Sequence, residues 1–136
     1  MRIAVVGMGK IGLPLAVHYA RSGHGVVGVD VNPRVVDLVN GGAEPFPGEA
    51  HLAEYLPPLI SSGVLRATTN YAEAVPGADA VVMVVPLVVD AESRPDFTIM
   101  DAATRSMAAH LTPGTLVSYE TTLPVGTTRG RYKPLI

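Results

Sequence analysis

The sequence predicts a single α/β domain built on a parallel β-sheet with helices on both faces. Short apolar runs alternate with segments of helical spacing along the chain, and brief turns rich in glycine and proline separate them. The run from Ala80 to Val85 consists of apolar, mostly β-branched residues, as expected for a strand buried on both faces. With right-handed crossovers, this alternation predicts the strand order 3-2-1-4-5 of a Rossmann-type, doubly wound sheet.

The elements expected in the first half of the chain follow from local signals. Apolar residues spaced three and four apart after the first strand indicate a helix, and Ser22-Gly23 ends it. Asn32 and Pro33 are typical of a helix start, and Gly41-Gly42 of a helix end. The expected order is a strand at 3–6, a helix from Ile11, a strand at 26–29 and a helix from Pro33.

The second half continues the same alternation. Residues 52–60 have helical spacing, but we expect Pro57-Pro58 to kink or split that helix. Met100, Ala103, Met107 and Leu111 form a stripe of helical spacing that we interpret as core packing. The expected order is a strand at 65–68, a brief helix capped by Asn70, a strand at 80–85, a helix within 96–111 and a strand at 115–119.

The composition fits one domain covering residues 1–136 and excludes several classes of partner. A hydrophobic content of 48% supplies ample core, and the net charge of −2 predicts neither nucleic acid nor an anionic membrane as partner. The longest apolar run, residues 80–89, is too short to span a bilayer, so we expect a cytoplasmic protein. The chain contains no cysteine, which excludes thiol catalysis within it, and its histidines lack a spacing suited to a metal.

The most specific signal is a glycine-rich turn directly after the first strand. Gly7-Met8-Gly9-Lys10-Ile11-Gly12 match the GxGxxG pattern, in which backbone approaches a pyrophosphate at a helix N-terminus. Asp30 closes the second strand 18 residues after Gly12, where its carboxylate can accept hydrogen bonds from the adenosine ribose. Because a carboxylate repels a 2′-phosphate, the pattern predicts NAD rather than NADP.

Other candidate residues lie where the remaining strands end. Ligands of such sheets bind beyond the carboxyl ends of the strands, which selects Val85 and Pro86 and the segment from Glu120 to Thr122. Thr122 is the best single candidate there, because its hydroxyl can both donate and accept. Two further candidates follow Asp30: Asn32 can contact the ribose or cap a helix, and Arg34 can pair with Asp30, reach the adenosine or be merely solvated.

These motifs together resemble the N-terminal domain of the UDP-glucose/GDP-mannose dehydrogenase family, the nucleotide-sugar 6-dehydrogenases. The matching segments are MRIAVVGMGKIGLPLA, DVNPRVVDLVNGG, EPFPGEAHLAEYLPPLISSGVLRATTNYAEAV and ETTLPVGTTR, which cover essentially the whole chain. An enzyme of the β-hydroxyacid dehydrogenase type would share the glycine turn but not ETTLPVGTT. Two features depart from the family: Leu87 replaces a common threonine after Pro86, and the Pro57-Pro58 pair is unusual.

The resemblance implies an oxidoreductase that converts the C6 alcohol of a UDP- or GDP-sugar to a uronate with two NAD. It implies that residues 7–12 hold the pyrophosphate, Asp30 and Arg34 the adenosine side, and Val85 and Pro86 the cofactor cleft, with Thr122 beside the reacting centre. ETTLPVGTT resembles the branch acting on UDP-N-acetyl-amino sugars.

The family's catalytic cysteine, substrate domains and homo-oligomer contacts are expected outside this chain, which would then bind NAD without turnover. The alternative is a stand-alone nucleotide-binding regulatory module.

Overall fold

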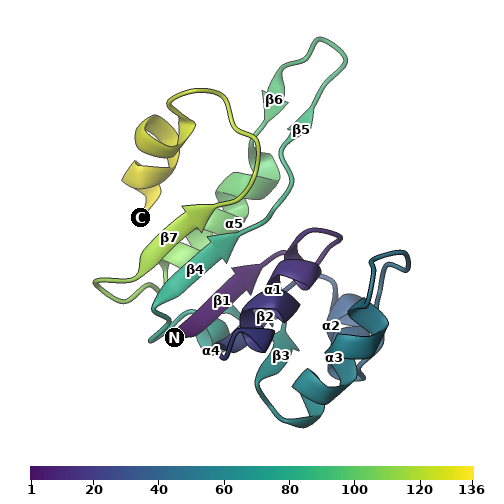
Figure 1. Cartoon of the computed structure of the whole chain (residues 1–136). Coiled ribbons are helices and arrows are strands. Elements are labelled where there is room, and N and C mark those ends of the chain that lie inside the picture. Colours follow the sequence, from purple (N-terminus) through teal and green to yellow (C-terminus); the bar gives the residue numbers. More distant parts are fainter.

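The five predicted strands form one parallel sheet in the order β3-β2-β1-β4-β7, as the computed structural model of residues 1–136 shows (Figure 1). The strands are β1 (Arg2–Val6), β2 (Gly25–Val29), β3 (Leu65–Thr68), β4 (Ala80–Met83) and β7 (Leu116–Tyr119). Since β1 pairs with both β2 and β4, the winding direction reverses beside it. The predicted fold class and strand order are therefore confirmed.

Alternate residues of each strand enter two separate cores, one on each face of the sheet. Ile3 and Val5 of β1 face the first core, which is covered by α1 (Gly12–Arg21), α2 (Pro33–Asn40) and α3 (Leu52–Ser61). Ala4 and Val6 face the second core, which is covered by α4 (Tyr71–Ala74) and α5 (Thr98–Ala108). Tyr132 of the C-terminal turns η1 (Thr128–Tyr132) and η2 (Lys133–Leu135) completes that second core.

The structure departs from the local expectations at two elements and contains one element that the sequence did not predict. Helix α3 is not split, because Leu52 and Leu56 hold it against the core while Pro57 and Pro58 lie on its exposed side. The carbonyls that lose their partners there can bond to water. Strand β4 ends at Met83 rather than residue 85. The expected helix within 96–111 is present as α5, but the sequence did not predict the short hairpin of β5 (Val88–Val89) with β6 (Pro95–Asp96), which precedes that helix and projects beyond the sheet (Figure 1).

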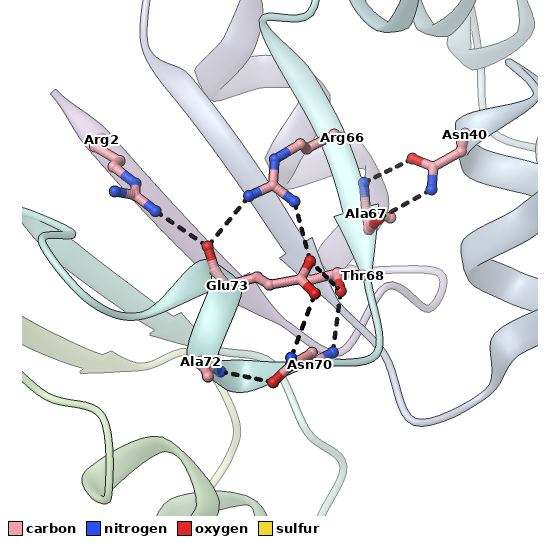
Figure 2. A network of polar contacts seen from close by, with 8 residues as sticks. All are labelled: Arg2, Asn40, Arg66, Ala67, Thr68, Asn70, Ala72 and Glu73. Atoms are coloured by element: carbon pink, nitrogen blue, oxygen red, sulfur yellow. Dashed lines mark hydrogen bonds and ion pairs between the residues drawn. The ribbon is translucent and has the colours of Figure 1, made fainter.

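A polar network secures the edge strand β3, which lies next to β2 (Figure 2). Asn40 mimics a neighbouring strand: its amide donates to the Ala67 carbonyl at 2.9 Å and accepts from the Ala67 N–H at 2.8 Å. Glu73 accepts from the Thr68 hydroxyl at 3.0 Å and forms an ion pair with Arg66 at 3.6 Å. Because Asn40 pairs both backbone groups of Ala67, this part of the edge strand is fixed beside β2. None of the helices is long and apolar enough to cross a membrane.

Candidate functional site

A cavity of about 530 Å³ opens at the carboxyl ends of β1, β2 and β4. This is the edge of the sheet where the sequence places its candidate residues. The walls are mostly aliphatic, and Asp30 is their only charged residue. The lining residues are Val6, Gly7, Gly9, Val29, Asp30, Val31, Tyr71, Val84, Val85, Pro86, Thr98, Ile99, Ala102, Ala103 and Ser106.

Two of the three glycines of the turn are required for steric reasons within the chain, and the third is not. Gly7 has φ of +94°, and a Cβ there would lie 2.9 Å from the Val84 carbonyl oxygen. A Cβ on Gly12 would overlap the carbonyl oxygen of Gly7, so only glycine lets α1 start this close to β1. A Cβ on Gly9 would meet nothing within 4 Å, although Gly9 lines the cavity. The backbone at Gly9 is therefore open to a ligand.

The carboxylate of Asp30 is fixed by two backbone donors. The Met8 N–H donates to Oδ2 at 2.8 Å, and the Asn32 N–H donates to Oδ1 at 2.9 Å. The Asp30 N–H itself donates to the Thr68 carbonyl, which joins the residue to β3. Each carboxylate oxygen keeps further acceptor capacity. Asp30 can therefore accept hydrogen bonds from a diol that enters the cavity.

Other residues of the glycine turn lie beside the cavity rather than in it. The Met8 side chain is fully buried and packs over Gly28 of β2, where a Cβ would overlap its thioether. Lys10 and Ile11 are exposed before the first turn of α1. Ile11 is the N-cap residue of α1 and provides no side-chain cap. The positive end of the helix dipole is thus available to an anion.

Asn32 and Arg34 begin α2 outside the cavity. The Asn32 side chain accepts from the Arg34 N–H at 3.0 Å, which confirms its predicted capping role. Arg34 is exposed and forms no ion pair with Asp30, so the pairing that the sequence allowed is not formed. Its guanidinium makes no hydrogen bond or ion pair within the chain.

The ends of β4 and β7 are tied together. Val85 and Pro86 line the cavity, as the strand-end rule predicts. The Thr121 hydroxyl donates to the Val85 carbonyl at 2.9 Å, which places the segment after β7 beside the segment after β4. Glu120 and Thr122 are exposed, and neither lines the cavity; Glu120 accepts from the Ser118 hydroxyl.

Sequence reasoning missed one wall of the cavity, formed by Tyr71 of α4 and one side of α5. From α5 come Thr98, Ile99, Ala102, Ala103 and Ser106. Val31 and Ile99, which are 82% and 54% exposed, present apolar surface at the opening. Burial, followed by the charge of Asp30, raises the pKa of Tyr71, so its phenol stays protonated at neutral pH.

An apolar cleft between a glycine turn and a strand-end aspartate, at the point where the winding reverses, defines a dinucleotide-binding domain of the Rossmann type. The whole chain, residues 1–136, matches the NAD binding domain of the UDP-glucose/GDP-mannose dehydrogenase family. The chain therefore belongs to that family, as the resemblance of its motifs predicted.

Similar proteins agree with this membership. UDP-N-acetyl-D-mannosamine dehydrogenase of Escherichia coli K12 is 40% identical over 93% of this chain, which covers 29% of that protein. NDP-N-acetyl-D-galactosaminuronic acid dehydrogenase of Ralstonia nicotianae is 41% identical over 93% of this chain, which covers 29% of that protein. The solved structure of UDP-D-ManNAc dehydrogenase from Pyrococcus horikoshii superposes with a TM-score of 0.91 at 34% identity, over 99% of this chain and 32% of that one.

A second solved structure, GDP-mannose dehydrogenase from Pseudomonas aeruginosa, also has a TM-score of 0.91, at 28% identity, over 99% of this chain and 31% of that one. This chain thus spans about a third of the length of the relatives it matches.

Proposed function

We propose that this chain binds NAD in the cavity and acts as the cofactor half of a nucleotide-sugar 6-dehydrogenase. The observation that carries the proposal is Asp30, whose carboxylate is held by two backbone N–H groups and is the only charge in an apolar cleft beside Gly7 and Gly9. Family membership as the NAD-binding domain supports the same conclusion.

Each part of the site fits a part of the cofactor. The open backbone at Gly9 and the uncapped start of α1 would hold the pyrophosphate. Asp30 would accept from the adenosine ribose hydroxyls, while Asn32 and Arg34 would stand at their outer side. Val31 and Ile99 would cover the adenine ring.

The opposite end of the site would hold the reacting part of the cofactor. Val85 and Pro86 would line the path toward the end of β7, where Glu120 and Thr122 stand as candidates for contact with the nicotinamide half. Bound NAD supplies a hydride acceptor at its nicotinamide ring.

For the whole protein we propose oxidation of the C6 alcohol of a UDP- or GDP-sugar to the uronate with two NAD. The E. coli and R. nicotianae relatives are both named for N-acetylated amino sugars, which supports a substrate of that class. This chain contains no cysteine, so a thiol for the second oxidation would have to come from outside residues 1–136. Substrate domains and the contacts of a homo-oligomer would lie there as well, and residues 1–136 by themselves would bind NAD without turnover.

Calorimetric titration of the chain with NAD and with NADP tests the proposed function. We expect NAD to bind with a dissociation constant in the micromolar to millimolar range and NADP to bind more weakly. The expected preference follows from the repulsion between the Asp30 carboxylate and a 2′-phosphate. No NAD binding at millimolar concentration, or tighter binding of NADP, would show the proposal to be wrong.

A further inference from the structure

A cluster of aromatic and charged side chains joins the C-terminal turn η1 to helix α5. The Arg131 guanidinium donates to both carboxylate oxygens of Asp101, from Nε at 2.8 Å and from a terminal nitrogen at 2.7 Å. The same guanidinium lies 4.3 Å from the centre of the Phe97 ring. Bidentate pairing and stacking together fix the orientation of a planar guanidinium. This hydrogen bonding lowers the pKa of Asp101.

The neighbouring residue anchors the same turn in the core. Tyr132 is fully buried, stacks on Tyr119 with ring centres 4.5 Å apart, and meets the edge of Phe97. The Tyr119 hydroxyl lies 3.1 Å from the hydroxyl of the buried Thr104 on α5. Asp101 and Thr104 therefore hold η1 and β7 from one side of α5, while Ile99 and Ala102 form the cavity wall on another side.

The loop between β7 and η1 is tied to the segment after β4 at its start, and at its end an internal hydrogen bond closes it just before the anchored turn η1. At its start, the Thr121 hydroxyl bonds to the carbonyl of Val85, which lines the cavity. At its end, the buried Thr127 hydroxyl donates to the Pro124 carbonyl at 2.7 Å, directly before the turn that carries Arg131. Thr122 lies between these anchors, is exposed and makes no hydrogen bond of its own.

The direction of a bound dinucleotide follows from the order of the strands. In the proposed function Asp30, at the end of β2, accepts from the adenosine ribose, and the glycine turn after β1 lies next in the sheet. A dinucleotide that continues in this direction places its second nucleotide beyond β4 and β7. The loop at 120–127 would thus lie beside the half of the cofactor that reacts.

We propose that Arg131 is a positioning residue, which through Asp101 and Phe97 fixes the loop at 120–127 against α5 in the conformation that meets the nicotinamide half of the cofactor. The proposal rests on the proposed function, because it concerns the same cofactor in the same cleft. A loop that is already ordered loses less entropy when the ligand binds, so a break in this anchor weakens only the contacts that the loop makes.

The test compares two ligands that differ at the half in question. NAD carries the nicotinamide ring, whereas ADP-ribose keeps the adenosine and the pyrophosphate and lacks that ring. For Arg131→Met we expect the dissociation constant for NAD to rise about threefold to tenfold, and that for ADP-ribose to change less than about twofold. Arg131→Lys keeps the positive charge but loses the bidentate hydrogen bonding and the stacking of the guanidinium. Its dissociation constant for NAD should therefore lie between those of Arg131→Met and the unchanged chain.

Arg129→Met is the matched control, because Arg129 lies in the same turn, is exposed and forms no ion pair. It should leave both dissociation constants unchanged. Thermal unfolding of each variant establishes the folded fraction at the titration temperature, and Arg131→Lys carries the test if Arg131→Met does not fold.

The positioning role is wrong if the Arg131 variants raise the dissociation constants for NAD and ADP-ribose by the same factor. It is also wrong if these variants bind NAD as tightly as Arg129→Met does. Failure of the unchanged chain to bind either ligand refutes the proposed function instead.

Discussion

Replacing Asp30 with alanine removes a ribose acceptor and a structural clamp in one change. In the free chain the carboxylate accepts from the N–H groups of Met8 and Asn32 at 2.8 and 2.9 Å. The Asn32 amide is exposed and can bond to water after the change, whereas the partly buried Met8 amide is left without a partner. An unpaired buried donor costs about 1–3 kcal/mol, so we expect the free energy of unfolding to fall by about 2 kcal/mol.

The effect of Asp30→Ala on binding is larger than its effect on stability. Hydrogen bonds to a charged group contribute about 1.5–3 kcal/mol each, and a ribose presents two hydroxyls to the carboxylate. Some of this energy is recovered when water replaces the lost partner, so we expect a loss of about 3 kcal/mol, or roughly a hundredfold in the NAD dissociation constant. The binding free energy of NADP should fall much less, because the same change removes the charge that repels its 2′-phosphate. The ratio of the two constants should therefore move toward one.

Calorimetric titration of both cofactors, with urea unfolding of the same samples, measures the two effects separately. Asp37→Ala is the matched control, because Asp37 is an exposed carboxylate on α2 whose side chain makes no hydrogen bond or ion pair. It should alter neither cofactor affinity nor stability by more than about 0.5 kcal/mol. If Asp30→Ala raised the dissociation constants for NAD and NADP by the same factor, the assignment of Asp30 to the ribose would be wrong.

Further predictions concern the glycine turn and the C-terminal cluster. Gly9→Ala should weaken NAD binding without loss of stability, since Gly9 lines the cavity and a Cβ there would meet nothing within 4 Å in the free chain. Gly12→Ala should instead lower the free energy of unfolding by about 3 kcal/mol, because its Cβ would overlap a backbone carbonyl, and urea unfolding with NAD titration separates the two outcomes. Tyr132→Phe should leave the free energy of unfolding unchanged or raise it by about 1 kcal/mol, since the buried Tyr132 hydroxyl has no hydrogen-bond partner. Urea unfolding measures this, and a clear loss of stability would contradict it. The Arg131 hydrogen bond lowers the pKa of Asp101 in the folded chain, so the ion pair stabilises the fold above the ordinary carboxyl pKa and loses this effect as pH falls through the lowered value. The stability difference between the unchanged chain and Asp101→Asn should accordingly shrink between about pH 5 and pH 2 in urea titrations, and a difference independent of pH would contradict the linkage.

The sheet and the glycine turn could be predicted because their signals are local. A strand buried on both faces needs a short apolar run, and Ala80 to Met83 supply one. Gly7 and Gly12 are glycines for steric reasons that also define the recognisable spacing. The hairpin β5–β6 gave no such signal, since its two strands have two residues each and one contains Pro95.

The wall formed by α5 could not be predicted from periodicity. Met100 and Met107 identify the side of the helix that enters the core, and both are fully buried as the stripe predicts. Ala102 and Ser106 line the cavity from another side of the helix, but small residues resemble any solvent-exposed helix surface in sequence. They have a role only because the fold places α5 beside the same cavity as Val84 and Val85, which follow β4.

The cofactor motif of this chain extends to residues that would touch no cofactor. Met8 lies between Gly7 and Gly9, yet its side chain is buried over β2, and it fits there only because Gly28 has no Cβ. Burial of that side chain fixes the backbone of the turn, so the Met8 N–H points at Asp30 and orients the carboxylate before any ligand arrives. Gly28 on β2 and Asp30, which directly follows that strand, thus act as a pair: Gly28 leaves room for the Met8 side chain, and Asp30 accepts a hydrogen bond from the Met8 N–H. The spacing of GMGKIG and GVVGVD therefore encodes a preorganised acceptor, which the glycine pattern alone does not specify.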